Sequence, residues 1–567
     1  KGYNGNYKQE AFASLVNIDN IKMIEVLYNI AVNDKTNAQA ALNRYTSLVA
    51  KSAHTSIRKY QLYRRALEIA SDVKVQNRLI NLLGETHTYQ ALMLVEKYMD
   101  NKATAEAAAE AVRTIASKNS ENFGGEPVRK ALEKAIACFK EAGHADAGYA
   151  IDDINAILQR LPQAAYIPIF GNAEWTVIAL NPAQKASMNP KKNKKHEALT
   201  ATTSDLWKIT ENGIAYTGGK NAILGTGNYE NFELWFEWKG TGKAGLGVRS
   251  IRQIDLGGDK SGALSGNIKT KNTPEKVADN IAGEWNTVYV KVLNDRVTVS
   301  VNGVVTATNI ILENSCDRNI PAYVKGQLML IGEGTPVEYR EMYIRELPST
   351  PKFNLPAEEA KEGFEILFDG TSMHKWTGNT TDYVPVDGTI YVTAQYGGSG
   401  NLYTVKEYSD FVFRFEFAFM REGVNNGVGI RTPMGVDAAY EGMEIQILDH
   451  DAPIYKGLRE YQQHGSVYGI IPAKRVKFPA LGEWNTEEIR AVGDRITVTV
   501  NGEIILDGNI REACQGHNVS EDGSTKNPHT VDRKNHPGLF NKSGHIGFLG
   551  HGAGVKFRNI RIKDLSK

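Results

Sequence analysis

A long internal repeat constrains the fold of this chain more than any other feature of its sequence. The segment GEWNTVYVKVLNDRVTVSVNG (283–303) aligns without a gap on GEWNTEEIRAVGDRITVTVNG (482–502), with 12 identities in 21 positions. Two further pairs of segments flank it in the same order: YENFELWFEW matches YSDFVFRFEF, and KGQLMLIGEGTPVEYREMYIREL matches KSGHIGFLGHGAGVKFRNIRIKDL. A duplication of this extent predicts two similar domains in tandem.

Each copy has the pattern of a β-sandwich. DRVTVSVNG and DRITVTVNG each alternate apolar with polar residues and contain an Asn-Gly turn. Many short strands with tight turns and nearly no helix indicate two packed antiparallel sheets. Pro-rich breaks at 161–170 and 347–356 separate the blocks. We therefore expect a first β-sandwich over 165–347 and a second over 357–567.

The residues before the repeat predict helices instead. Between about 20 and 160, segments such as TSIRKYQLYRRALEIAS and EPVRKALEKAIACFKEA place apolar residues three and four positions apart. Successive amphipathic helices joined by short turns stack into an α-solenoid, and these resemble HEAT-type repeats in pattern; an irregular bundle is the alternative. We expect residues 1–160 to form this helical domain and to offer a docking surface for a protein partner. The whole chain is thus predicted to be a multidomain α + β protein.

Composition excludes several classes of function. Lys and Arg number 66 and Asp and Glu 65, so no global field attracts nucleic acid or an acidic membrane. No apolar run reaches the roughly 18 residues of a membrane span. The three cysteines, Cys138, Cys316 and Cys514, form neither a metal-binding spacing nor a disulfide framework. The first residues, KGYNGN, lack an initiator Met and a signal sequence, which suggests a processed or truncated start.

Five segments of the second block carry a resemblance to a known family. FEILFDGTSMHKWTG, NNGVGIRTP, YEGMEIQILD, GEWNTEEIRAVGDRITVTVNG and SGHIGFLGHGAGVKFRNIRIKDL occur in this order between 364 and 565. Together they resemble the 3-keto-disaccharide hydrolases, formerly a domain of unknown function; the match from 167 to 347 is weaker. The resemblance implies a jelly roll similar to concanavalin-type lectins and laminin-G domains. It also implies a glycoside or oligosaccharide substrate whose C3 hydroxyl is oxidised to a ketone, and an exported, periplasmic or cell-envelope location in bacteria.

The repeat also serves as an internal control for function, because features shared by both copies are expected to be structural. Glu444 of the second block falls on Arg252 or Gln253 of the first, and His551 falls on Glu333. Eight of the 12 histidines lie in the second block. We therefore expect the second sandwich to be catalytic and the first to be a degenerate partner.

The implied substrate defines what the site must supply. A ketone at C3 acidifies the hydrogen at C2, so a base can remove it and the aglycone at C1 can leave in a 1,2-elimination; later addition of water gives net hydrolysis. The protein needs a base with a pKa near neutral, a donor or positive charge at the enolate oxygen, and an acid for the leaving oxygen. No cofactor is assigned, although a divalent metal is an option for the second role.

The strand GMEIQILDHD (442–451) supplies the first candidates. Its apolar residues alternate with Glu444 and Gln446, which predicts one apolar and one polar face. We expect Glu444 to act as the base and Gln446 to bind substrate. Asp449 follows at the strand end, where it would orient a base or bind a sugar hydroxyl or a metal.

The remaining candidates come from other segments. His551 lies in GHGAG, where glycines allow close approach of a substrate, and Tyr468 would act as an acid or an enolate donor. Arg431 in GIRTP offers a forked donor, but its counterpart Arg249 points to a structural role. The predicted catalytic residues are Glu444, His551, Tyr468 and Asp449, and the predicted substrate-binding residues are Arg431, Gln446, His464 and Trp376. A structural role is the alternative for each, and a metal site made of Glu444, His464 and His551 is a further alternative.

A polar insertion in the second block, residues 512–544, is far longer than an ordinary connection. It is expected to be a lid or substrate wall, with His517, His529 and His536 contributing to recognition; none of these has a metal-binding spacing.

Two other functions stay open from the sequence. A conventional glycoside hydrolase needs two carboxylates about 5–10 Å apart. A tandem carbohydrate-binding protein would use Trp376, Tyr391 and Tyr396 as stacking platforms. The presence of extra ionisable groups in only one block favours an enzyme over a binder.

Overall fold

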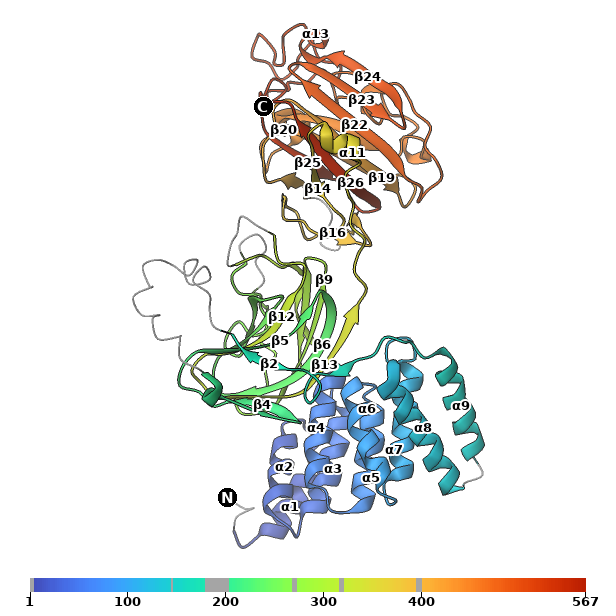
Figure 1. The fold of residues 1–567 in the computed structure, drawn as a ribbon, viewed down its shortest axis with the longest axis vertical. Helices are drawn as coiled ribbons and strands as arrows, with labels where there is room; N and C mark the ends of the chain where they lie inside the picture. The colour runs from blue at the N-terminus through green and yellow to red at the C-terminus, as the bar shows by residue number, and fades with distance from the viewer. Residues whose placement is uncertain are drawn as a thin grey trace.

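The computed structural model describes residues 5–143, 146–178, 203–267, 273–315, 321–393 and 400–566. An N-terminal helical region is followed by two antiparallel β-sandwiches, which confirms the predicted multidomain architecture (Figure 1). Cys316 and Tyr396 lie outside the described residues. None of the described helices is both long enough and apolar enough to span a bilayer.

The helical region is built from amphipathic helices that pack mainly against their neighbours in sequence. Their bounds are α1 (Lys8–Val16), α2 (Met23–Asn33), α3 (Ala38–Lys51), α4 (Ser56–Ile69), α5 (Val73–Gly84), α6 (Tyr89–Glu96), α7 (Ala105–Lys118), α8 (Gly125–Ala142) and α9 (Ala147–Arg160). Thr55 and Thr88 cap α4 and α6 by accepting hydrogen bonds from backbone N–H groups of the first turn. The buried faces form one continuous apolar core. A HEAT-type repeat within this region stays a prediction.

The first sandwich packs a large sheet on a smaller one. The large sheet has the order β11 (Val304–Ile311), β10 (Arg296–Val301), β9 (Asn286–Leu293), β6 (Asn231–Gly240), β13 (Val337–Leu347), β4 (Gly213–Tyr216) and β3 (Trp207–Thr210), with β1 (Ile167–Pro168) also on β13. The smaller sheet has the order β2 (Trp175–Val177), β5 (Ala222–Tyr229), β12 (Gly326–Gly332), β7 (Ala244–Val248) and β8 (Ile251–Leu256). Alternate residues of both sheets fill an apolar core between them.

The second sandwich repeats this topology strand for strand. Its large sheet has the order β24 (Glu503–Asn509), β23 (Arg495–Val500), β22 (Asn485–Val492), β19 (Phe411–Phe419), β26 (Val555–Asp564), β17 (Thr389–Val392) and β16 (Tyr383–Val386), with β14 (Phe364–Phe368) also on β26. Its smaller sheet has the order β15 (Trp376–Gly378), β18 (Leu402–Thr404), β25 (His545–Gly550), β20 (Asn425–Thr432) and β21 (Met443–Leu448). A phenylalanine-rich core separates the two sheets.

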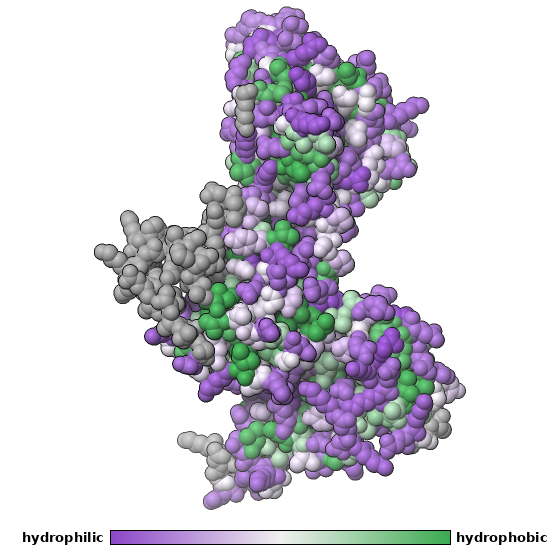
Figure 2. Space-filling view, viewed as in Figure 1, coloured by the Kyte–Doolittle hydropathy of each residue, from purple (hydrophilic) through white to green (hydrophobic). Residues whose placement is uncertain are grey.

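Polar contacts join the three parts of the chain. On α4, Arg64 pairs with Glu341 of β13 at 3.1 Å, and Gln61 donates to Asn302 at 2.7 Å, so part of the helical surface is covered by the first sandwich. Between the sandwiches, the buried Arg296 donates to the carbonyl oxygen of Thr380 at 2.8 Å. The face of the molecule in Figure 2 is mainly hydrophilic, with scattered apolar residues on all three parts.

Candidate active site

A cavity of about 420 Å³ lies on the outer face of the smaller sheet of the second sandwich. The floor comes from β20, β21 and β25, and the walls come from the short helix α12 (Ala438–Glu441) and from the loop after β21. Four of the eight predicted site residues line it: Glu444, Gln446, Tyr468 and His551.

Glu444 lies on the floor of the cavity. Met443, Ile445 and Ile447 point into the core, so alternation along β21 turns Glu444 and Gln446 to the opposite face, as the sequence predicts. The side chain of Glu444 is almost completely buried, and its Oε1 makes no hydrogen bond with any described residue. Burial, with a smaller contribution from the negative charge of Asp437, raises the pKa of Glu444 to about 8.

His551 lies at the rim, at the end of β25. Its Nε2 is 3.8 Å from Oε1 of Glu444, and its side chain is 48% exposed. Burial of the ring lowers the pKa of His551, while Asp437 opposes this shift. Because the pKa of Glu444 is raised and the pKa of His551 is lowered, the Glu444 carboxyl group is protonated and the His551 ring is neutral near pH 7.

Gln446 and Tyr468 place further polar groups in the cavity. Gln446 Nε2 donates to Oδ1 of Asn425 at 3.2 Å, which leaves its buried Oε1 without a hydrogen bond among the described residues. The backbone N–H of Tyr468 donates to the Glu444 carbonyl, so the ring is anchored to β21. Burial raises the pKa of Tyr468, and its hydroxyl keeps its proton near neutral pH.

The register of the first sandwich identifies the counterpart of each floor residue. Glu444 pairs with Gly429, whose counterpart Gly247 pairs with Arg252. The two alignments that the sequence leaves open are therefore resolved in favour of Arg252. A register shift beside this pair accounts for the extra residue in β8.

Trp376 and His464 do not reach the cavity, which corrects their expected role in substrate binding. Trp376 is fully buried, donates from Nε1 to the Leu367 carbonyl at 2.9 Å and stacks on Phe548 in the core. The His464 ring is fully buried on the core side of β21, with Nε2 3.3 Å from Glu487. The alternative metal set with Glu444 and His551 therefore does not assemble.

Arg431 and Asp449 have structural roles, again in contrast to their predicted ones. Arg431 is buried and donates to the Ser409 and Gly493 carbonyls, each at 2.7 Å, and to Asp410. Its counterpart Arg249 makes two equivalent contacts in the first sandwich, to the Glu230 carbonyl and to Asn231, and its third hydrogen bond goes to the Tyr323 carbonyl. Asp449 Oδ2 accepts from the Gly423 N–H at 2.9 Å and so closes the end of β21.

Several residues that line the cavity were not predicted from the sequence, among them Asn401, Asn425, Asp437 and Tyr440. Asn425 is brought beside Leu448 by the β20–β21 register, and Asp437 and Tyr440 come with α12. Asn401 joins them from a distant segment, where its Oδ1 accepts a hydrogen bond from the Gly550 N–H at 3.0 Å. Glycines at alternate positions in NNGVGI were the available clue, since they open the floor between larger side chains.

The insertion (512–544) supports the cavity wall from behind rather than lining the cavity. Gly538 N–H donates to the Tyr440 carbonyl at 2.8 Å, and Lys534 Nζ donates to the Tyr440 hydroxyl at 2.8 Å. The buried His536 holds the Ala439 carbonyl at 2.9 Å through Nδ1. None of the three histidines expected to contribute to recognition, His517, His529 and His536, lines the cavity.

Comparison with known proteins finds relatives that each match less than two fifths of this chain. A curated 3-keto-disaccharide hydrolase of Bacteroides thetaiotaomicron is 27% identical over an alignment of 256 residues, which covers 39% of this chain and 86% of that protein. A solved protein of Parabacteroides distasonis ATCC 8503, which bears the provisional name glycosyl hydrolase, is 25% identical over 38% of this chain and all of its own, with a TM-score of 0.32. A second structure from that organism is 24% identical over 36% of this chain and 99% of its own, with a TM-score of 0.31.

The family model for the 3-keto-alpha-glucoside-1,2-lyase-like domain matches residues 186–345 and 363–563. These segments make up more than half of the chain and include most of both sandwiches. The chain therefore belongs to the family of 3-keto-alpha-glucoside-1,2-lyase-like domains.

Proposed function

We propose that the chain cleaves 3-keto-glycosides in the cavity of the second sandwich, by removal of the C2 proton and 1,2-elimination, with net hydrolysis when water adds afterwards. The observation that carries this proposal is Glu444, a buried carboxyl group with a pKa of about 8 on the floor of the cavity. A base whose pKa lies near the working pH is what proton abstraction beside a carbonyl group requires. Family membership supports the substrate class.

The reaction balances without an external oxidant or reductant. Glu444 takes the proton from C2, and the electron pair of that C–H bond forms the C2–C3 double bond of an enolate with negative charge on the C3 oxygen. The enolate then re-forms the C3 carbonyl group, a double bond forms between C1 and C2, and the C1–oxygen bond to the aglycone breaks. The leaving oxygen takes up a proton. The sugar product is a 2-hydroxy-3-keto-glycal, and addition of water across C1 and C2 converts it to the free 3-keto sugar.

Tyr468 and Gln446 are suited to the polar groups of such a substrate. Since burial keeps the Tyr468 hydroxyl protonated, this hydroxyl is our candidate donor to the enolate or to the leaving oxygen. The buried Oε1 of Gln446 lacks a hydrogen bond among the described residues, so it is a suitable acceptor for a sugar hydroxyl. His551 lies at the rim with Nε2 3.8 Å from Oε1 of Glu444, and its lowered pKa leaves the abstracted proton on the Glu444 carboxyl group.

The first sandwich lacks the counterparts of this chemistry. Arg252 occupies the register position of Glu444, and Glu333 stands where the second block has His551. An arginine cannot act as a base at neutral pH, because its guanidinium group stays protonated. We therefore assign the reaction to the second sandwich alone and infer a supporting role for the first.

A conventional glycoside hydrolase is the second candidate, because Asp437 is another carboxyl group that lines the cavity. Asp437 Oδ1 accepts a hydrogen bond from the Ala439 N–H at 3.1 Å and caps α12. This capping role ties Asp437 to the wall, and we therefore favour the 3-keto reaction over one that needs both carboxyl groups to be free.

One comparison of substrates separates the candidates. The full chain is incubated with a glucoside and with its 3-keto derivative, and aglycone release and enone absorbance are followed. We expect cleavage of the 3-keto derivative only, with enone absorbance that persists for a lyase and decays for a net hydrolase. Cleavage of only the unoxidised glucoside would favour the conventional hydrolase, and turnover of neither would favour a carbohydrate-binding protein.

Two matched variants test the assignment of the base. Glu444→Gln removes the carboxylate without changing the size of the side chain, and Glu460→Gln makes the same change at an exposed position. We expect the first to lose at least about a hundredfold in kcat, since general base catalysis contributes 10²–10⁴-fold, and the second to be unchanged. Full activity of Glu444→Gln would remove Glu444 from the mechanism.

A further inference from the structure

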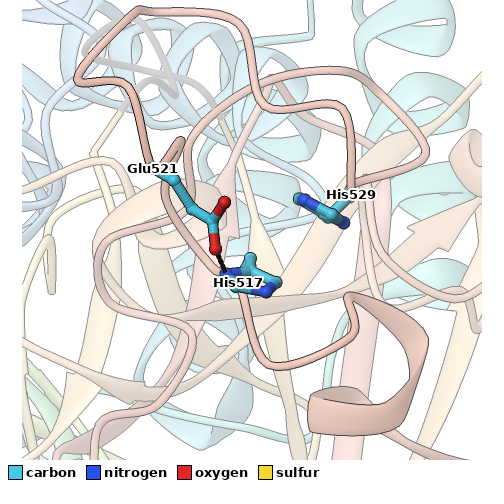
Figure 3. A group of neighbouring side chains, drawn as sticks. All are labelled: His517, Glu521 and His529. Carbon is cyan, nitrogen blue, oxygen red and sulfur yellow. Dashed lines mark ion pairs between the residues drawn. The ribbon is translucent and has the colours of Figure 1, made fainter.

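The insertion (512–544) brings together two histidines and a glutamate that are separated in sequence. His517 Nδ1 lies 3.0 Å from Oε1 of Glu521, and the rings of His517 and His529 lie side by side, with centroids 4.4 Å apart and planes tilted by 30° (Figure 3). One ligand atom from each of the three residues lies within 4.8 Å of the other two. Among the residues that the structure describes, no other group of three or more His, Cys, Asp or Glu side chains has ligand atoms this close together.

The backbone around this group is fixed by a buried side chain. Asn527, which is fully buried, donates from Nδ2 to the His517 carbonyl at 2.8 Å and accepts from the His529 N–H at 3.0 Å. One amide therefore holds both histidines side by side. Gln515 Oε1 lies 3.2 Å from Nδ1 of His529, and a hydrogen bond from Nδ1–H would leave Nε2 of this ring as the free electron-pair donor.

We propose that His517, Glu521 and His529 bind a divalent cation of the Zn²⁺ type, which ties together the two halves of the insertion. Two imidazoles and one carboxylate form a common three-residue ligand set for Zn²⁺, with the fourth position open to water. Ligands about 2.1 Å from Zn²⁺ in a tetrahedron lie ~3.4 Å apart, so small side-chain rotations within this group, whose ligand atoms are within 4.8 Å of one another, bring the set into range. All three residues keep partial contact with solvent, so the ion has a path of entry.

Hydrogen bonds connect this site to the cavity wall. Asn518, next to His517, accepts from the His536 N–H at 2.7 Å through its carbonyl group and donates to the His536 carbonyl at 3.2 Å. His536 in turn holds the Ala439 carbonyl in α12. A cation at the site therefore stabilises the segment that supports the wall, whichever reaction the cavity performs.

The experiment measures metal binding directly. The 567-residue chain is freed of metal with a chelator and then titrated with ZnCl₂ by calorimetry. We expect one equivalent to bind per chain. Glu521→Gln and His529→Ala should each weaken binding at least tenfold, and Glu512→Gln, an equivalent charge change at an exposed position of the same insertion, should bind like the wild type. An absence of binding, or wild-type affinity in His529→Ala, would overturn the proposal.

A second measurement needs no variant and no activity. Co²⁺ replaces Zn²⁺ in such sites, and its visible absorption reports a tetrahedral environment. We expect one equivalent of CoCl₂ to give this absorption and to raise the thermal unfolding midpoint of the wild-type chain. Octahedral absorption, like that of free Co²⁺, together with an unchanged midpoint would contradict the proposal even if the variants fail to fold.

Discussion

Gly427 of β20 lies against the carboxyl group of Glu444, and a Cβ atom on this glycine would come within 2.2 Å of Glu444 Oε1. The two residues are diagonal neighbours across β20 and β21, since Gly427 pairs with Gln446 and Glu444 pairs with Gly429. The absent side chain at position 427 therefore provides the space that the carboxyl group occupies. The same glycine is in the segment NNGVGI, which the family resemblance includes.

Gly427→Ala should displace the Glu444 carboxyl group while the fold persists. The clash involves the far end of a side chain that can rotate, so we expect the free energy of unfolding to change by less than about 1 kcal/mol. Because a displacement of about 1 Å in a reacting group can cost about a hundredfold in rate, kcat on a 3-keto-glucoside should fall by about 10²-fold. Gly457→Ala is the control, since a Cβ there meets nothing within 4 Å. Equal rates for the two variants would contradict this role of Gly427.

The pH dependence of the reaction should follow the titration of Glu444. Its pKa of about 8 means that the carboxylate, which is the active form of the base, becomes the main species only above this pH. We therefore expect kcat/KM to rise with pH from 6 and to level off near 9, with a midpoint close to 8. The lowered pKa of His551 keeps the imidazole neutral over this range. A profile that is flat from pH 6 to 9 would show that the carboxyl group of Glu444 does not limit the reaction.

Glu444 should also reduce stability at alkaline pH. Its pKa is 4.5 for an ordinary carboxyl group and about 8 in the fold, so between these values the unfolded chain loses a proton that the folded chain keeps. The free energy of unfolding therefore falls as pH rises through this range, by at most about 1.4 kcal/mol per pH unit, and levels off above pH 8. Glu444→Gln abolishes this titration.

The measurement compares Glu444→Gln with the wild type in chemical denaturation at pH 4.5 and pH 8. We expect nearly equal stability of the C-terminal sandwich at pH 4.5 and a gain of about 4 kcal/mol for the variant at pH 8. Glu460→Gln, at an exposed position, should follow the wild type at both values. A gain that is the same at both pH values would point to packing rather than to ionisation.

Part of the site could be predicted from the sequence because it depends on local geometry. The two-residue period of β21 turns Glu444 and Gln446 away from the core, and this holds for any strand with one buried face. The alternation stops where β21 ends, so it could not predict that the Asp449 carboxylate accepts a hydrogen bond from the Gly423 N–H. The repeat further showed that the first block lacks a counterpart of Glu444. Because both sandwiches have the same strand order, a sandwich of this topology forms without that residue.

Other residues could not be placed because their environment comes from distant strands. Trp376 lies in β15, and only its pairing with β18 and the packing of Phe548 bury the indole. His464 follows β21 by 16 residues, and its hydrogen bond with the Leu448 N–H returns the loop to the core. Asn425 and Asp437 reach the cavity through the β20–β21 register and the short helix between these strands, and the two-residue alternation alone specifies neither.

Arg431 and Arg249 occupy equivalent positions in the two sandwiches, so each is a control for the structural role of the other. Each side chain is buried and donates to two backbone carbonyls and one side chain, and neither lines the cavity. Lysine keeps the charge but lacks the forked geometry, so buried acceptors lose their partners. We expect Arg431→Lys and Arg249→Lys each to lower the free energy of unfolding of their own sandwich by about 2–4 kcal/mol. KM for a 3-keto-glucoside should stay within about twofold in both folded variants, because neither guanidinium group faces the cavity. A tenfold rise in KM for Arg431→Lys with unchanged stability would instead return Arg431 to the substrate-binding residues.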